Sequence, residues 1–274
     1  MKTGINIGTF TWELDMEGCI REAASIGYDG IELMLNEDGN LSLDSTDEEL
    51  LGYRNAAEKY GIRIPSLASG LYWHYSFTSD DPCIREKAMQ IAHRQIDAAK
   101  VLGADTVLII PGAVNVPFLP DSPVIPYDIA YERALHAMKE LAPCAEKNKI
   151  TVAMETVWNG FLLSPLETRD FVDKIGSDYM KVYMDVGNVW NFGYPQQWIR
   201  ILGSRIARVH VKDFKKSMGT LKGFCELLEG DVPYPEIMQS LRDIGYDGSL
   251  TAEIESAPGA VQRTYDALTQ ILRM

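Results

Sequence analysis

Cysteine and long apolar runs are scarce in this 274-residue chain. The four cysteines, Cys19, Cys83, Cys144 and Cys225, are far apart and form no C-x-x-C pair, so they indicate neither a disulfide framework nor a cysteine-rich metal site. Glu13 and Asp15 interrupt the N-terminal segment too early for a secretory leader, and no run approaches the ~20 apolar residues of a membrane span. We therefore expect a reduced, cytoplasmic protein that does not cross a membrane.

Basic residues are also few. The chain has 26 Lys and Arg against 39 Asp and Glu, which gives a net charge of -13. Nucleic acids and anionic membrane surfaces bind proteins through basic faces that displace counterions. The composition therefore predicts no nucleic-acid partner and no membrane partner, although it leaves room for a local basic pocket.

The chain contains repeated units of a short apolar run followed by an amphipathic helical stretch, with no linker between them. This alternation is typical of βα units, and eight of them fit a closed (β/α)8 TIM barrel. We predict one such domain over residues 1–274. The expected strands lie near 4–9, 30–34, 63–68, 105–111, 150–155, 180–185, 206–211 and 249–254.

Local signals support this arrangement. Asp81 and Pro82 predict the start of a helix that ends at Gly103, and Ser164 with Glu167 predicts a capping box. The segment Ile-Gly-Tyr-Asp-Gly occurs at 26–30 and again at 244–248, where its first glycine suits the residue after a helix and its second enters a strand. The alternative, a doubly wound open sheet, normally has a glycine-rich dinucleotide turn that residues 4–8 do not match.

Four predicted strands end in a side chain that can bind a metal ion: Glu155, Asp185, His210 and Glu253. Parallel strands would place these side chains at one end of a barrel, where such folds keep their chemistry. Three carboxylates and an imidazole suit Mn²⁺, Mg²⁺ or Co²⁺ better than a structural zinc ion. A hydroxyketone bound through two oxygens at such an ion would become acidic at carbon, which predicts proton-transfer chemistry.

The motifs around these residues carry a family resemblance. They are Ala153-Met154-Glu155, Met184-Asp185-Val186-Gly187-Asn188, Val209-His210-Val211-Lys212-Asp213 and Thr251-Ala252-Glu253-Ile254. In this order they resemble the xylose isomerase-like TIM barrels of the sugar phosphate isomerase/epimerase superfamily, and within it the ketose and ketose-phosphate 3-epimerases. The resemblance covers nearly the whole chain, from the region of Trp12 to the last strand.

The resemblance implies the roles of the site residues. Glu155 and Glu253 would bind the metal and also act as the acid/base pair on opposite faces of the substrate, whereas Asp185 and His210 would mainly be ligands. Inversion at one carbon needs a base on one side and an acid on the other, which agrees with this assignment. Relatives also imply a homo-oligomer.

Two positions depart from the pattern of the non-phosphorylated ketose epimerases. Asn188 stands where those enzymes have a histidine, and Lys216, beside Lys215, stands where they have an arginine. Both favour a phosphorylated or acidic sugar. The predicted partner is therefore a small sugar or sugar phosphate.

Further residues are candidates for binding substrate. Trp12 and Trp158 suit a wall against a sugar ring or packing at the barrel rim. His74 suits a role in binding substrate or supporting the metal, and Lys212, two residues past His210 on the same side of the strand, suits a substrate oxygen or a structural ion pair. Glu32 remains open between a fifth active-site carboxylate and a buried partner of another group.

Competing functions remain on this scaffold. An aldose–ketose isomerase moves the proton between C1 and C2, and an inosose dehydratase is a third enzyme of the same kind. The superfamily also includes an apurinic endonuclease with a metal cluster, but DNA repair needs a basic groove and more histidines than the four in this chain. A metal-dependent 3-epimerase is the leading interpretation.

Overall fold

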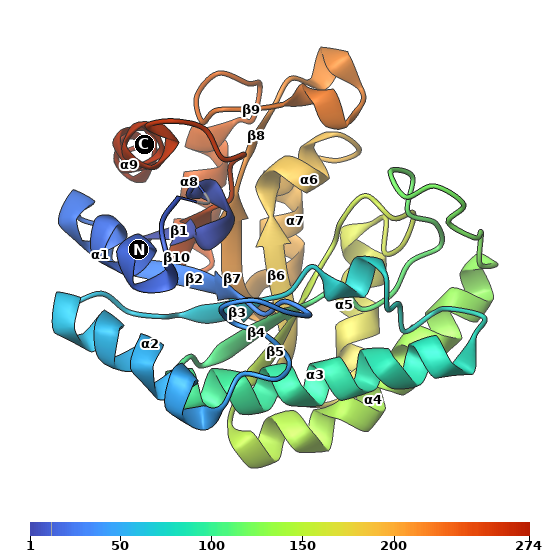
Figure 1. Cartoon of the computed structure of the whole chain (residues 1–274). Coiled ribbons are helices and arrows are strands. Elements are labelled where there is room, and N and C mark those ends of the chain that lie inside the picture. Colours follow the sequence, from blue (N-terminus) through green and yellow to red (C-terminus); the bar gives the residue numbers. More distant parts are fainter. Residues whose placement is uncertain (12) are drawn as a thin grey trace.

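The predicted barrel is confirmed by a computed structural model, which describes residues 1–11 and 13–274. Eight parallel strands close on themselves in the order β1-β10-β7-β6-β5-β4-β3-β2, and helices surround them (Figure 1). The barrel strands are β1 (Lys2–Asn6), β2 (Gly30–Met34), β3 (Ser66–Ala68), β4 (Thr106–Ile109), β5 (Thr151–Glu155), β6 (Met180–Asp185), β7 (Ile206–Val211) and β10 (Ser249–Ala252).

The helices follow the strands along the chain and lie on the outside of the barrel. They are α1 (Met16–Ile26), α2 (Asp47–Tyr60), α3 (Pro82–Leu102), α4 (Tyr127–Asn148), α5 (Pro165–Ile175), α6 (Val186–Trp190), α7 (Pro195–Leu202), α8 (Tyr234–Asp243) and α9 (Ala260–Leu272). The last helix, α9, lies beside α1 and so completes the outer ring (Figure 1). No helix among the described residues combines the length and the apolar character that a membrane crossing requires.

Two of the predicted helix boundaries hold for the predicted reasons. The side chain of Asp81 accepts a hydrogen bond from the amide of Cys83 at the start of α3, and Gly103 ends that helix with a φ of 79°. In the repeated segment, Gly27 and Gly245 both have positive φ, 113° and 71°, where a side chain would be strained. The repeat therefore encodes the same helix-to-strand turn twice, before β2 and before β10.

Two local predictions need correction. The first strand ends at Asn6 rather than residue 9, because the Asn6 side chain accepts from the amide of Gly8 and begins a short 3₁₀ helix. The capping box of α5 is half formed: Ser164 accepts from the amide of Glu167, but the Glu167 carboxylate binds the Tyr127 hydroxyl and the amide of Leu163 instead. The complete box lies at α2, between Thr46 and Glu49.

A short hairpin that sequence reasoning missed lies over the carboxyl end of the barrel. It pairs β8 (Asp213–Phe214) with β9 (Phe224–Cys225), both within the long connection after β7 (Figure 1). The buried Asp213 carboxylate accepts from the amides of Phe214, Leu228 and Val232 and so anchors this connection. The Asp213 oxygens are therefore engaged by the backbone of this loop.

Candidate metal centre

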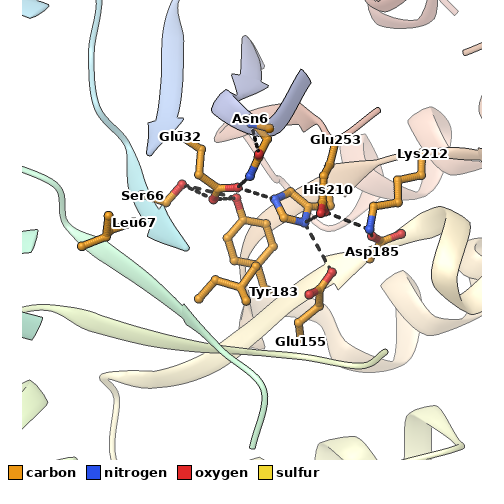
Figure 2. A network of polar contacts seen from close by, with 12 residues as sticks. Asn6, Glu32, Ser66, Leu67, Glu155, Tyr183, Asp185, His210, Lys212 and Glu253 are labelled. Carbon is orange, nitrogen blue, oxygen red and sulfur yellow. Dashed lines mark hydrogen bonds and ion pairs between the residues drawn. The ribbon is translucent and has the colours of Figure 1, made fainter. Parts of the chain in front are cut away.

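The four predicted ligands converge at one point of the barrel. One ligand atom from each of Glu155, Asp185, His210 and Glu253 lies within 4.8 Å of the others (Figure 2). Strands β5, β6, β7 and β10 are neighbours in the sheet, and Asp185 pairs directly with His210 in the register of β6 and β7. The alternation of side chains along each strand then turns all four residues inward at the carboxyl end.

The His210 ring presents its two nitrogens to different groups. Nδ1 lies 3.0 Å from Glu253 Oε2 and 3.3 Å from Glu155 Oε1, so it faces the cluster. Nε2 lies 2.7 Å from Glu32 Oε1 on the other side of the ring (Figure 2). The nitrogen available to a metal ion is therefore Nδ1.

Asp185 has one oxygen committed and one free of hydrogen bonds. Oδ1 accepts from the amide of Asn188, which fixes the rotamer of the side chain. Oδ2 is buried and accepts no hydrogen bond from any described residue. Lys212 Nζ lies 3.1 Å from it and forms an ion pair, but the angle is not that of a hydrogen bond. A buried carboxylate oxygen that accepts no hydrogen bond destabilises the folded protein unless it binds a cation.

These observations test whether a divalent metal ion fits. Three carboxylates and one imidazole nitrogen are hard donors of the kind that Mn²⁺, Mg²⁺ and Co²⁺ accept, and the spare oxygen of Asp185 points into their cluster. Glu155, Asp185 and His210 are buried and Glu253 is about one-third exposed, so the cluster is open to solvent on the Glu253 side. The residues fit a divalent ion with room for substrate oxygens.

The two glutamates lie in environments that push their pKa values apart. Burial raises the pKa of Glu155 to about 7, although the hydrogen bond with His210 and the charge of Lys212 oppose this shift. Burial acts in the same sense on Glu253, but the charges of Lys212 and His210 outweigh it and hold the pKa of that carboxyl well below its ordinary value. Such a contrast is the pattern expected of an acid and a base that share one site.

Lys212 is the cation nearest the cluster. Its Nζ lies 2.8 Å from Glu253 Oε2 and 3.1 Å from Asp185 Oδ2. Burial alone would lower the pKa of Lys212, but the neighbouring carboxylates raise it well above its ordinary value, so the side chain is charged at neutral pH. As predicted, Lys212 and His210 both line the space above the barrel.

That space consists of two adjoining cavities of about 170 and 700 Å³. The smaller lies over the ligands and has an apolar wall that includes Trp73, Leu108, Phe118, Trp158 and Phe224. The larger opens beside it and has an acidic lining: Asp213, Glu226, Glu253 and Glu255. Asn6, Met34, Lys212, Leu221, Phe224 and Glu253 line both cavities, so the two are continuous.

Besides Lys212, two of the predicted substrate-binding residues lie in the smaller cavity. Trp158 donates its indole N–H to the carbonyl oxygen of Asn188, which fixes the ring as one wall. The amide nitrogen of the Asn188 side chain lies 3.3 Å from Glu155 Oε1. Both residues are therefore placed to touch a ligand bound over the cluster.

Two other predicted substrate-binding residues are not brought to this site by the described structure. His74 is exposed and does not line either cavity. Lys216 lines neither cavity, and its Nζ lies 4.3 Å from the centre of the Trp190 ring and 4.9 Å from that of Tyr194. Trp12 lies outside the described residues.

The cavity walls also include residues that sequence reasoning missed. Leu221 and Phe224 come from the long connection after β7, and Phe118 comes from the loop before α4. Nothing in the local pattern of these loops marked them, because apolar residues in a loop are usually packing residues. Asn6 was missed because the first strand was predicted to run to residue 9, which placed Asn6 inside the strand rather than at its end.

The sequence comparison places the chain in a family. Residues 20–271 match the xylose isomerase-like TIM barrel, so the chain belongs to this family and the predicted resemblance is confirmed. The L-ribulose-5-phosphate 3-epimerases UlaE of Shigella boydii and Escherichia coli are 26% identical to it over 249 residues, which cover 86% of this chain and 81% of each relative.

Solved structures share the fold over almost their whole length. A D-psicose 3-epimerase determined in the presence of D-fructose has a TM-score of 0.83 at 21% identity and covers 99% of both chains. The D-psicose 3-epimerase from Clostridium cellulolyticum H10 with D-tagatose has a TM-score of 0.82 at 20% identity, also over 99% of both chains. At these identities the structures show a shared fold.

Proposed function

We propose that this protein is a divalent-metal-dependent ketose 3-epimerase that removes the C3 hydrogen of its substrate on one face and returns a proton on the other. The observation that carries the proposal is the convergence of Glu155, Asp185, His210 and Glu253 on one point at the carboxyl end of the barrel. The 3-epimerase names of the relatives that match most of the chain support the same reaction.

The arrangement of the two glutamates supports their use as the acid/base pair. Glu155 and Glu253 come from the first and last of four adjacent strands, so they approach the cluster from its two sides. Glu253, which Lys212 and His210 keep ionised, is suited to take the C3 proton, and Glu155, whose pKa burial raises to about 7, is suited to give one. In the reverse direction the two residues exchange these roles.

Asp185 and His210 would complete the ligand set, and Mn²⁺, Mg²⁺ and Co²⁺ are the candidate ions. When bound, such an ion supplies Lewis-acid chemistry, because it draws charge from the oxygens on C2 and C3 and makes the C3 hydrogen more acidic. Lys212 adds a positive charge beside Glu253, where it can donate to a substrate oxygen. Trp158 and Phe224 shield the reacting carbon from water.

The cavities favour a free ketose over a ketose phosphate. A phosphate group binds most strongly to arginine, lysine or several free amides. Lys212 is the single lysine or arginine among the described residues that line the two cavities, and it already faces two carboxylates. Lys216, a candidate for binding a phosphorylated or acidic sugar, packs on Trp190 and Tyr194.

Product analysis distinguishes an epimerase from an isomerase. The protein loaded with Mn²⁺ and incubated with D-fructose, D-tagatose or D-psicose should give the C3 epimer of each accepted ketose and no aldose, measured by ¹³C NMR. Asp185→Ala, which removes one candidate ligand that does not itself line the cavities, should give no product under the same conditions. An aldose as the main product would instead support proton transfer between C1 and C2, the aldose–ketose isomerase reaction.

A further inference from the structure

Glu32 is a buried carboxylate with four side-chain hydrogen-bond partners among the described residues. The proposed reaction gives it no role. It lies in β2, is fully buried, and lines neither of the two cavities. Ser66 and Tyr183 donate to its Oε2 at 2.6 and 2.7 Å, while Asn6 and His210 lie 2.7 Å from its Oε1 (Figure 2). No substrate reaches this carboxylate, so any influence on the reaction passes through one of these partners.

The donors around Glu32 are identified by their own contacts. The Asn6 side-chain oxygen accepts from the amide of Gly8, which turns the Asn6 NH₂ group toward Glu32. Hydroxyl groups and an amide N–H thus fill three of the about four acceptor positions of an ionised carboxylate. The fourth position faces His210 Nε2. The stable arrangement therefore has a hydrogen on Nε2, and this N–H donates a hydrogen bond to Glu32.

A proton on Nε2 determines what the other nitrogen can do. In a neutral imidazole one nitrogen carries the hydrogen and the other carries a lone pair. A metal ion binds the ring nitrogen that gives up its hydrogen, and with Nε2–H bonded to Glu32 that nitrogen is Nδ1, which lies 3.0 Å from Glu253 Oε2 inside the cluster. The Tyr183 ring, whose centre lies 4.2 Å from that of His210, packs on the imidazole and limits its rotation.

We propose that Glu32 is a positioning residue of the metal centre, which holds His210 in the tautomer and orientation that direct Nδ1 to the metal. A carboxylate behind a metal-bound histidine fixes the ring and strengthens it as a ligand, and loss of such a partner weakens metal binding by about 10- to 100-fold. This inference rests on the metal site of the proposed function. It adds a second layer, built from β1, β2, β3 and β6, beneath the four ligands.

The first test uses the unaltered protein. With ¹⁵N-labelled histidine, the four histidines give few signals, and His210→Asn identifies the signal of His210. We expect Nε2 to carry a proton before metal is added, and Zn²⁺, a diamagnetic probe, to shift Nδ1 while the Nε2 proton remains. An unprotonated Nε2, or a Zn²⁺-dependent loss of its proton, would contradict the proposal.

The second test compares metal affinities of variants by calorimetry with Mn²⁺. Glu32→Gln keeps the shape of the side chain and an acceptor oxygen but loses the charge, and we expect its Kd to rise about tenfold. Ser66→Ala is the matched control, since it removes one buried hydrogen bond from the other oxygen of Glu32 and does not contact His210. Its Kd should stay within about threefold of the wild-type value.

The outcomes separate this inference from the proposed function. If the wild type binds Mn²⁺ and Glu32→Gln binds it equally well, Glu32 is structural and the inference fails alone. If the wild type binds no divalent ion, the metal site itself fails. Should Glu32→Gln not fold, Glu32→Asp keeps the charge but withdraws the carboxylate from His210 Nε2, and an unchanged His210 spectrum together with an unchanged Kd in that variant would also count against the positioning role.

Discussion

Glu253→Gln should lower kcat about a thousandfold while the protein still binds its metal ion. The amide keeps the shape of the side chain and one ligand oxygen but cannot carry the proton, and general acid–base catalysis typically contributes about 10²- to 10⁴-fold. Lys212, which donates to Glu253 Oε2 at 2.8 Å, retains an acceptor in the amide oxygen. Steady-state kinetics and Mn²⁺ titration of the same preparation measure both quantities.

The control for this variant is Glu146→Gln, an exposed glutamate of α4 that lines neither cavity. It loses the same charge and should match the wild type in kcat and in metal affinity. A Glu253→Gln protein with wild-type kcat would show that this carboxylate does not carry the proton. A loss of kcat that more Mn²⁺ restores would assign Glu253 to metal binding alone.

A free ketose should be a better substrate than its terminal phosphate by at least about 100-fold in kcat/KM. The larger cavity, where the far end of a ketose would extend, is lined by four carboxylate residues, Asp213, Glu226, Glu253 and Glu255. Juxtaposition of like charges costs several kcal/mol, and a 100-fold effect corresponds to about 2.7 kcal/mol. Paired assays of D-fructose and D-fructose 6-phosphate, and of L-ribulose and L-ribulose 5-phosphate, measure the ratio.

Lys216→Gln tests the origin of this preference. Because the ammonium group packs on Trp190 and Tyr194 rather than facing the cavities, its loss should change KM for either substrate less than about twofold. A KM for the phosphate that is tenfold lower than for the free sugar, and that rises in this variant, would restore Lys216 as a phosphate ligand. The substrate class would then be that of the L-ribulose-5-phosphate epimerases.

The barrel and its four ligands were accessible from the sequence because both depend on local patterns. A single polar residue at the end of an apolar strand predicts a side chain at the carboxyl end of a parallel barrel. This rule holds for four residues: Glu155, Asp185, His210 and Glu253. Lys212 followed from the two-residue repeat of a strand. No long-range information was needed beyond the assumption that the strands are parallel.

The parts that the sequence did not settle depend on contacts between distant segments. Lys216 and Trp190 are 26 positions apart, and no local pattern indicates that the lysine packs on the ring. Glu32 and His210 are separated by 178 positions, so the sequence left the role of Glu32 open between several partners. Glu167 was expected to complete a capping box, but Tyr127 from another helix offers its carboxylate a better-placed donor.

The most direct test of proton transfer at C3 is turnover in D₂O with Mn²⁺-loaded protein and a free ketose. Glu155 and Glu253 face the cavity, and Glu253 is about one-third exposed, so each proton can exchange with solvent between removal and return. We expect deuterium at C3 of the recovered ketose and of its epimer, with none at C1, by ²H and ¹³C NMR. Deuterium at C1 or in an aldose product, with C3 unlabelled, would contradict the assignment as a 3-epimerase.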